Sequence, residues 1–311
     1  MKQMVDHAAP PVVFEADTAK AGQFVTREVQ TGTGPRRYKL YIPSSYDGSK
    51  AMPLVVVLHG CTQDPDNAAR GTRFNEVAEE SKVLIAYPEQ PAAANGLKCW
   101  NWFDPAHQKR DQGEPALIAG ITRQVMKDTK VDPHRVYIVG LSAGAAMALT
   151  VAYAYPEIFA AAGLHSGIAY GLATNTAEAI RTMGAGAADR VDLAAAVTSR
   201  MGVNHPIPAI VFHGRSDKTV NAANAVNIVA QLKTGFDSTA LEVRDEKSGL
   251  TPLGYHFTWR TFGHPSLIEE WSVEELGHAW SGGSKAGTYT DDRGPDATRV
   301  IMRFLLEHSR A

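Results

Sequence analysis

The 311-residue sequence lacks several features that would assign it to a specialised class of protein. It contains no apolar run near the ~18 residues that a membrane-spanning helix needs, so no membrane span is expected. Its 31 lysines and arginines are balanced by 33 acidic residues and form no long basic run, which argues against binding of nucleic acid. Its two cysteines are too few for a disulfide-rich scaffold, although they could form one bridge.

The beginning of the sequence lacks the apolar core of a secretory signal peptide. One interpretation of this is a cytoplasmic protein. The other is that the natural gene product begins before Met1, and a bridged cysteine pair would then favour a secreted or periplasmic protein. Residues 1–20, which include a Pro-Pro pair, are expected to form a loose leader. No feature of the sequence indicates an oligomeric state.

An alternation of strands and helices fills most of the chain. Apolar segments such as 54–58 and 136–139 have no polar interruption, which is typical of strands buried on both faces of a parallel sheet. Strands are expected at 24–31, 36–42, 54–58, 83–87, 136–139, 159–164, 207–212, 255–261 and 267–273, and helices at 66–81, 115–130, 143–155 and 296–308. The alternation predicts an α/β fold, with a mainly parallel sheet covered by helices on both faces.

Residues 167–206 interrupt this alternation. They are rich in alanine and helical in pattern, so we expect a small cap-like insertion there. No Pro/Gly/Ser-rich linker and no internal repeat divides the chain. Residues 21–311 are therefore expected to form a single α/β domain.

A serine stands at a strand–turn–helix junction that is typical of a catalytic nucleophile. Gly140-Leu141-Ser142-Ala143-Gly144 matches G-x-S-x-G, between the expected strand 136–139 and the expected helix 143–155. Such a turn gives the serine a strained backbone, and the two glycines avoid collisions with the neighbouring strand and helix. The alternative is the glycine-rich turn of a nucleotide-binding fold, but the sequence has neither G-x-G-x-x-G nor a Walker lysine.

A serine hydroxyl needs a histidine base and a carboxylate that orients this base. In hydrolases with the strand–turn–helix nucleophile, the chain order is Ser, then Asp or Glu, then His. Asp217 lies just past the strand 207–212, where the orienting acid belongs, and we assign it that role. Asp237 is the alternative acid. The alternative role of Asp217 is to cap a helix that begins near Thr219.

Four of the eleven histidines lie in the last part of the chain. His256 falls within a strand pattern, His264 in a tight turn and His308 near the chain end. Only His278 lies in a loop between a sheet strand and the final helix, which favours it as the base.

The loop after the strand 54–58 is the candidate oxyanion loop, with the sequence His59-Gly60-Cys61-Thr62-Gln63. A tetrahedral intermediate on the serine needs two or more N–H donors. One donor is expected to be the amide of Ala143, directly after the nucleophile. The other is expected to be the amide of Cys61, because Gly60 allows the backbone to approach closely.

Cys99 begins an aromatic segment, Cys99-Trp100-Asn101-Trp102-Phe103. Cys61 and Cys99 could be two free buried thiols, or one disulfide that ties this segment to the oxyanion loop. Aromatic and polar side chains near the expected site could line a substrate pocket, although the tryptophans could equally pack in the core. The candidate substrate-binding residues are His59, Gln63, Trp100, Trp102, Ser166 and Trp280.

Five motifs give the chain a resemblance to a known family. They are LHGCTQ (58–63), CWNWF (99–103), RVYIVGLSAGAAM (135–147), HGRSDKTV (213–220) and GHAWSGG (277–283). In this order they resemble poly(3-hydroxybutyrate) depolymerase-type esterases of the α/β-hydrolase fold, with feruloyl and acetylxylan esterases as relatives. The resemblance runs from about Phe24 to the chain end.

The resemblance implies a serine esterase whose catalytic triad is Ser142, Asp217 and His278. It also implies an oxyanion hole at Cys61 and Ala143, and a disulfide between the two cysteines. Secreted polymer depolymerases usually carry a signal peptide and a C-terminal polymer-binding module, and the sequence contains neither. Soluble hydroxyalkanoate oligomers and short-chain esters are therefore favoured over crystalline polymer, with feruloyl or acetylated sugar esters as the alternative.

No cofactor and no metal is expected. Glu275 and His278 form an isolated E-x-x-H pair, which is too little for a metal site. A peptidase on the same fold is the second enzymatic hypothesis. A non-catalytic polymer- or carbohydrate-binding protein is the third, and the complete Ser, Asp and His set argues against it.

Overall fold

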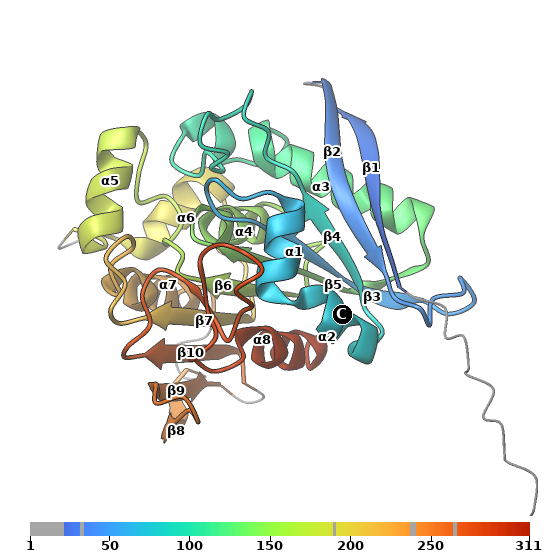
Figure 1. Ribbon diagram of the computed structural model, residues 1–311. Coiled ribbons are helices and arrows are strands. Elements are labelled where there is room, and N and C mark those ends of the chain that lie inside the picture. Colours follow the sequence, from blue (N-terminus) through green and yellow to red (C-terminus); the bar gives the residue numbers. More distant parts are fainter. Residues whose placement is uncertain (1–21, 32–33, 189–190, 237–240, 264–265) are drawn as a thin grey trace, which may run out of the picture.

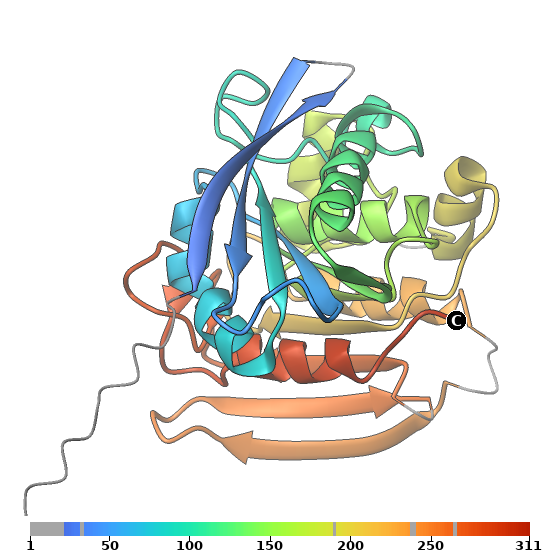
Figure 2. The ribbon, with the colours of Figure 1, turned by 90° about the vertical axis from the view of Figure 1, so that its right-hand side faces the viewer.

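The computed structural model describes residues 22–31, 34–188, 191–236, 241–263 and 266–311, and ten of the described strands form one sheet (Figures 1 and 2). Their order in the sheet is β1-β2-β4-β3-β5-β6-β7-β10-β9-β8. The strands are β1 (Gln23–Thr31), β2 (Gly34–Ile42), β3 (Met52–Leu58), β4 (Leu84–Pro88), β5 (Val131–Leu141), β6 (Ala161–His165), β7 (Ala209–Gly214), β8 (Val243–Leu250), β9 (His256–Phe262) and β10 (Ile268–Val273), with a separate short pair, β11 (Trp280–Ser281) and β12 (Thr290–Asp291).

Helices cover both faces of this sheet, as the sequence predicted. The helices are α1 (Pro65–Thr72), α2 (Phe74–Ser81), α3 (Gly113–Asp128), α4 (Ala143–Ala154), α5 (Thr176–Ala185), α6 (Leu193–Met201), α7 (Ala223–Lys233) and α8 (Ala297–Leu306), with one 3₁₀ turn, η1 (Pro105–His107). Alternate residues of β3 separate the two faces, because successive side chains of a strand point to opposite sides. Leu54, Val56 and Leu58 pack with α3, α4 and α7, whereas Val55 and Val57 pack with α1, α2 and α8.

The six central strands, from β4 to β10 in the sheet order, run parallel. The strands outside them are antiparallel, β1 and β2 at one end and β8 and β9 at the other. The registers align the carboxyl ends, since Gly140 pairs with Leu58 and Leu141 pairs with His165. Parallel strands all end at one edge, so the loops after β3, β5, β7 and β10 meet there.

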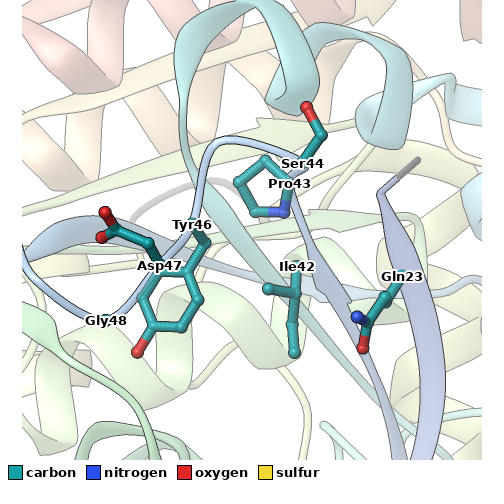
Figure 3. Close-up of a pocket in the computed structure, with 7 residues that line it drawn as sticks. All are labelled: Gln23, Ile42, Pro43, Ser44, Tyr46, Asp47 and Gly48. Carbon is teal, nitrogen blue, oxygen red and sulfur yellow. The ribbon is translucent and has the colours of Figure 1, made fainter. Parts of the chain in front are cut away.

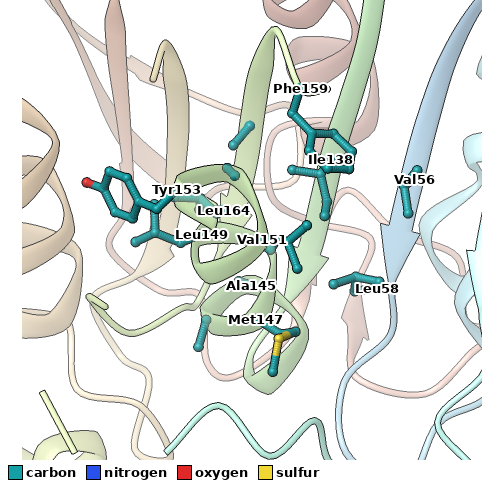
Figure 4. Packing of buried hydrophobic residues seen from close by; sticks show 14 of the residues in the cluster. Val56, Leu58, Ile138, Ala145, Met147, Leu149, Val151, Tyr153, Phe159 and Leu164 are labelled. Carbon is teal, nitrogen blue, oxygen red and sulfur yellow. The ribbon is translucent and has the colours of Figure 1, made fainter. Parts of the chain in front are cut away.

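Helix α4 lies in the centre of one face, and all of its residues are buried. Figure 4 shows its side chains among those of the sheet, including Met147 and Val151 near Leu58 and Ile138. The helix is apolar all round, which is typical of a helix enclosed on every side. The nucleophile turn therefore stands between a buried strand and a buried helix.

The structure corrects two of the predicted elements. The helix expected at 66–81 is two helices, because Arg73 takes a left-handed backbone (φ 62°) that ends α1 and precedes α2. The helix expected near Thr219 begins at Ala223. Strand β8 was not predicted, since its sequence VRDEKSGL is polar and almost entirely exposed at the sheet edge.

The predicted cap-like insertion at 167–206 contains α5 and α6. Helix α5 contacts α7, and α6 contacts both α4 and α7. Its role as a cap remains a prediction. The expected leader at 1–20, the alternative acid Asp237 and His264 lie outside the described residues. None of the described helices is long and apolar enough to cross a membrane.

Candidate active site

Ser142 lies in the sharp turn between β5 and α4. Its backbone has φ 58° and ψ −121°, a strained combination for a residue other than glycine. A Cβ atom at Gly140 would come within 2.2 Å of the Gly144 backbone, and one at Gly144 within 2.3 Å of the Leu58 carbonyl oxygen. Both positions therefore admit only glycine, and their tight packing holds the serine at the carboxyl edge of the sheet.

Ser142, His278 and Asp217 form one continuous line of hydrogen bonds. The Ser142 hydroxyl lies 3.0 Å from Nε2 of His278 and donates to it. Nδ1 of His278 donates to Oδ2 of Asp217 at 2.7 Å. A carboxylate only accepts, so it places the imidazole proton on Nδ1 and leaves Nε2 free to accept the serine proton. The three side chains come from the loops after β5, β7 and β10.

Asp217 caps no helix, because α7 begins at Ala223 and the residue before it is Ala222. The carboxylate instead has one oxygen in a turn and the other on His278. Its Oδ1 accepts from the amides of Thr219 and Val220, which closes the turn after β7, while its Oδ2 faces His278. Burial raises the pKa of this carboxyl, but the hydrogen bond and charge of His278 and the Val220 amide outweigh burial and hold the pKa below 3.8. The carboxylate is therefore ionised at neutral pH.

Two backbone amides beside Ser142 have no acceptor among the described residues. They are the amides of Cys61 and Ala143, which the sequence singled out as oxyanion donors. The amide of Gly60, by contrast, donates to Oε1 of Gln63 at 2.8 Å, and that of Thr62 donates to the Leu97 carbonyl. Unpaired amides next to a nucleophile can stabilise a developing negative oxygen.

A disulfide joins Cys61 to Cys99, so the predicted pairing is confirmed. It connects the candidate oxyanion loop to the aromatic segment that follows Cys99. The Trp100 indole strengthens this connection, because its Nε1 donates to the carbonyl of His59 at 3.1 Å. Buried Glu114 holds the same segment by accepting from the backbone and side-chain amides of Asn101. The segment that follows Cys99 thus holds the loop that carries the Cys61 amide.

The loop after β10 is also bound to the oxyanion loop. Nε2 of Gln63 donates to the Thr288 carbonyl at 2.9 Å, and Oδ1 of Asn67 accepts from the Thr288 amide at 3.0 Å. These contacts join the segment that follows His278 to the segment that follows β3. Asn67 and Thr288 were not singled out from the sequence, because both stand in polar segments without a recognisable motif.

Several of the expected substrate-binding residues are buried instead. Trp280 packs against His165 and Phe74 and donates to Thr298, and Trp100 is fully enclosed. The structure thus places both rings in the core, because each indole N–H finds its acceptor in the interior. Trp102 packs edge-on against Phe103. His59, Gln63 and Ser166 are also buried.

Three buried histidines surround the site and are held neutral. Nδ1 of His59 donates to the Gly60 carbonyl and its Nε2 accepts from the Gln90 amide, and burial lowers its pKa to about 4. Burial also lowers the pKa of His165 and of His213. His165 accepts from the Ser281 amide, and His213 donates to the Val220 carbonyl. Their rings therefore support the loops rather than react.

These histidines predict a loss of stability in mild acid. Between pH 6.5 and about 4 the unfolded chain binds a proton at His59 that the folded chain does not, so the free energy of unfolding falls as the pH falls. Each such histidine contributes a slope of about 1.4 kcal/mol per pH unit. Denaturant unfolding from pH 7.5 to 5 should show this decline. In His59→Asn, the slope of the free energy of unfolding against pH should be smaller by about 1.4 kcal/mol per pH unit, the contribution of one proton. An unchanged slope in the variant would contradict the assignment.

The described residues offer no cluster for a metal ion, and one cavity lies far from Ser142. In the described part of the chain, no group of three or more His, Cys, Asp or Glu side chains could hold a metal ion. Figure 3 shows a cavity lined by Ile42, Tyr46 and neighbouring residues. Because β2 runs antiparallel to β4, Ile42 lies at the edge of the sheet opposite Ser142. That cavity is therefore remote from the nucleophile.

The chain is similar to known depolymerases and esterases. A family model described as esterase PHB depolymerase matches residues 36–246, which include Ser142 and Asp217. Poly(3-hydroxyalkanoate) depolymerase C from Paucimonas lemoignei is 32% identical over 87% of this chain and 65% of its own length. Feruloyl esterase B from Thermothelomyces thermophilus is 26% identical over 77% of this chain and 82% of its own length.

Solved structures agree on the fold. An acetyl xylan esterase from Aspergillus awamori superposes with a TM-score of 0.67 at 20% sequence identity, covering 82% of this chain and 94% of that one. This likeness and the parallel sheet with helices on both faces confirm the predicted α/β-hydrolase fold. The family match covers more than half of the chain, and on this basis the protein belongs to the esterase PHB depolymerase family.

Proposed function

We propose that this protein is a carboxylic-ester hydrolase that works through an acyl-enzyme on Ser142. The observation that carries the proposal is the hydrogen-bonded line from the Ser142 hydroxyl through His278 to Asp217, beside the two unpaired amides of Cys61 and Ala143. A nucleophile, a base, an acid that orients the base and two oxyanion donors are together the parts that acyl transfer needs.

The reaction follows from these positions. Nε2 of His278 takes the proton of Ser142 as the hydroxyl oxygen attacks the ester carbonyl carbon. The amides of Cys61 and Ala143 stabilise the negative oxygen of the tetrahedral intermediate. His278 then gives its proton to the leaving alcohol, and a water molecule, activated by the same imidazole, releases the acid. Asp217 stabilises the positive imidazolium in both halves.

The substrate class rests on the relatives. We propose hydroxyalkanoate oligomers or short-chain esters, because a poly(3-hydroxyalkanoate) depolymerase is 32% identical over 87% of this chain. Feruloyl and acetylated xylan esters are the second candidate, because relatives with those names are 26% identical over 77% and 60% of the chain. In both cases the substrate is uncharged at the reacting carbonyl.

An acyl-enzyme predicts a burst of product. With 4-nitrophenyl acetate, we expect about one equivalent of nitrophenol per enzyme in the first turnover, before the slower steady state. Mass spectrometry of acid-quenched protein should show one acetyl group, located on the peptide that contains Ser142. A linear time course and an unmodified Ser142 peptide would argue for direct attack by water instead.

The same preparation can decide between the substrate classes. Hydroxybutyrate trimer, methyl ferulate and acetylated xylan are compared at equal enzyme concentration by kcat/KM. The proposal expects the trimer to exceed the other two by at least about tenfold. A higher kcat/KM for methyl ferulate or acetylated xylan would leave the acyl-enzyme mechanism in place and reassign the substrate.

A further inference from the structure

Tyr289 presents an exposed aromatic ring beside the candidate base. Its ring centroid lies 6.3 Å from that of His278, with the two planes at 73°, and the residue is 44% exposed. The tryptophans expected at the site are buried, so they cannot supply such a surface. Leaving a large aromatic ring half open to water gains little for folding, which points to another use.

The ring is held in place by both loops of the site. The Tyr289 hydroxyl accepts a hydrogen bond from Oγ1 of Thr62, the residue after Cys61. The Tyr289 carbonyl accepts from the amide of Trp280, two residues after His278. Its backbone is left-handed, at φ 53°. Strained residues fixed by several contacts are characteristic of functional sites, and a ring fixed before binding loses little entropy when it contacts a ligand.

The chemistry of the site tells which half of an ester passes this ring. This step rests on the proposed function. The base must reach the Ser142 oxygen first and the leaving alcohol oxygen afterwards, so the alcohol departs on the side of His278. Tyr289 stands on that side, next to the loop of the Cys61 amide. An alcohol leaving past the imidazole therefore meets the phenol ring.

We propose that Tyr289 binds the alcohol half of the ester and sets the preference for it. Alcohols with an apolar surface large enough to cover a phenol ring are bound, and methyl or ethyl alcohols are too small to use it. The acyl half lies outside this contact.

The rates of acylation and deacylation, measured separately, distinguish binding of the alcohol by Tyr289 from a purely structural role. The alcohol has left before deacylation begins, so a residue that contacts only the alcohol affects the first step alone. For Tyr289→Ala we expect kcat/KM for benzyl acetate to fall about tenfold, a loss of about 1.4 kcal/mol. The value for methyl acetate should change less than about twofold. The deacylation rate, measured as the steady-state phase after a 4-nitrophenyl acetate burst, should remain that of the wild type.

Two further variants complete the test. Tyr289→Phe keeps the ring and loses only the hydrogen bond from Thr62, so it should retain most of the wild-type kcat/KM for benzyl acetate. Val243→Ala removes an exposed apolar side chain at the start of β8, at the sheet edge opposite Ser142, and should change nothing. An equal loss for benzyl and methyl acetate, a slower deacylation, or no loss at all in Tyr289→Ala would overturn this inference alone. A wild type that forms no acyl-enzyme would overturn the proposed function, and this inference with it.

Discussion

Ser142→Ala is expected to lose at least ~10³-fold in kcat for a short nitrophenyl ester, because the variant has no atom that can form the acyl-enzyme. The substitution should leave the fold intact. Among the described residues, the Ser142 hydroxyl forms a hydrogen bond only with His278, and the Ser142 amide keeps its hydrogen bond to the His165 carbonyl. The residual rate should come from the amides of Cys61 and Ala143, which would still stabilise an oxyanion formed by water.

The control for this variant is Ser248→Ala. Ser248 is an exposed serine on β8, whose hydroxyl lies near that of Thr258. Its removal deletes the same atom far from the site, so the rate should remain that of the wild type. Thermal unfolding of all three proteins shows whether the comparison is between folded chains. If Ser142→Ala hydrolysed the ester as fast as Ser248→Ala, the assignment of the nucleophile would be refuted.

Asp217→Asn is expected to reduce kcat by about 10³- to 10⁴-fold, because it moves the proton of the His278 imidazole from Nδ1 to Nε2. The one oxygen that Asn retains is needed by the amides of Thr219 and Val220, which now bond to Oδ1 of Asp217. The new NH₂ group then faces His278 and donates to Nδ1. An imidazole that accepts at Nδ1 carries its proton on Nε2, so it cannot accept the proton of Ser142.

Asp192→Asn provides a matched control for the same chemistry. Oδ1 of Asp192 likewise accepts two successive backbone amides, those of Ala194 and Ala195, at the start of α6. This aspartate has no histidine partner among the described residues. Its replacement therefore reports the cost of changing a turn carboxylate, and kcat should remain near the wild-type value. Equal losses in the two variants would mean that Asp217 acts through its turn rather than through His278.

The nucleophile turn could be predicted because its requirements are steric and involve residues that are neighbours in the sequence. The glycines around Ser142 are required wherever a strand turns sharply into a buried helix, and the atoms that a Cβ would meet at Gly140 and Gly144 show this. The parallel core strands were recognisable from unbroken apolar runs such as 54–58. Asp217 and His278 were chosen because each follows an expected strand, in the chain order that hydrolases with such a nucleophile turn share.

The residues that the sequence could not place depend on contacts between distant segments. Trp280 is two residues from His278, yet its ring turns inward because His165 and Phe74 offer it a packed surface. Tyr289 lies in a polar segment without periodicity, and only the fold brings it to Thr62, 227 positions away. Strand β8 was not predicted because its sequence has no apolar pattern. An exposed edge strand needs no apolar side chains to form its backbone hydrogen bonds.

The disulfide that fixes the oxyanion loop also changes what the protein becomes when it unfolds. Cys61 and Cys99 are 38 positions apart, and the disulfide closes a loop of the chain that contains α1, α2 and β4. An unfolded chain still contains this covalently closed loop, and the loop excludes many conformations from the denatured ensemble. Chain-entropy arguments put that restriction at about 4 kcal/mol in favour of the native state. The same bond that fixes the loop of the Cys61 amide therefore also stabilises the fold as a whole, and reducing it should lower the free energy of unfolding.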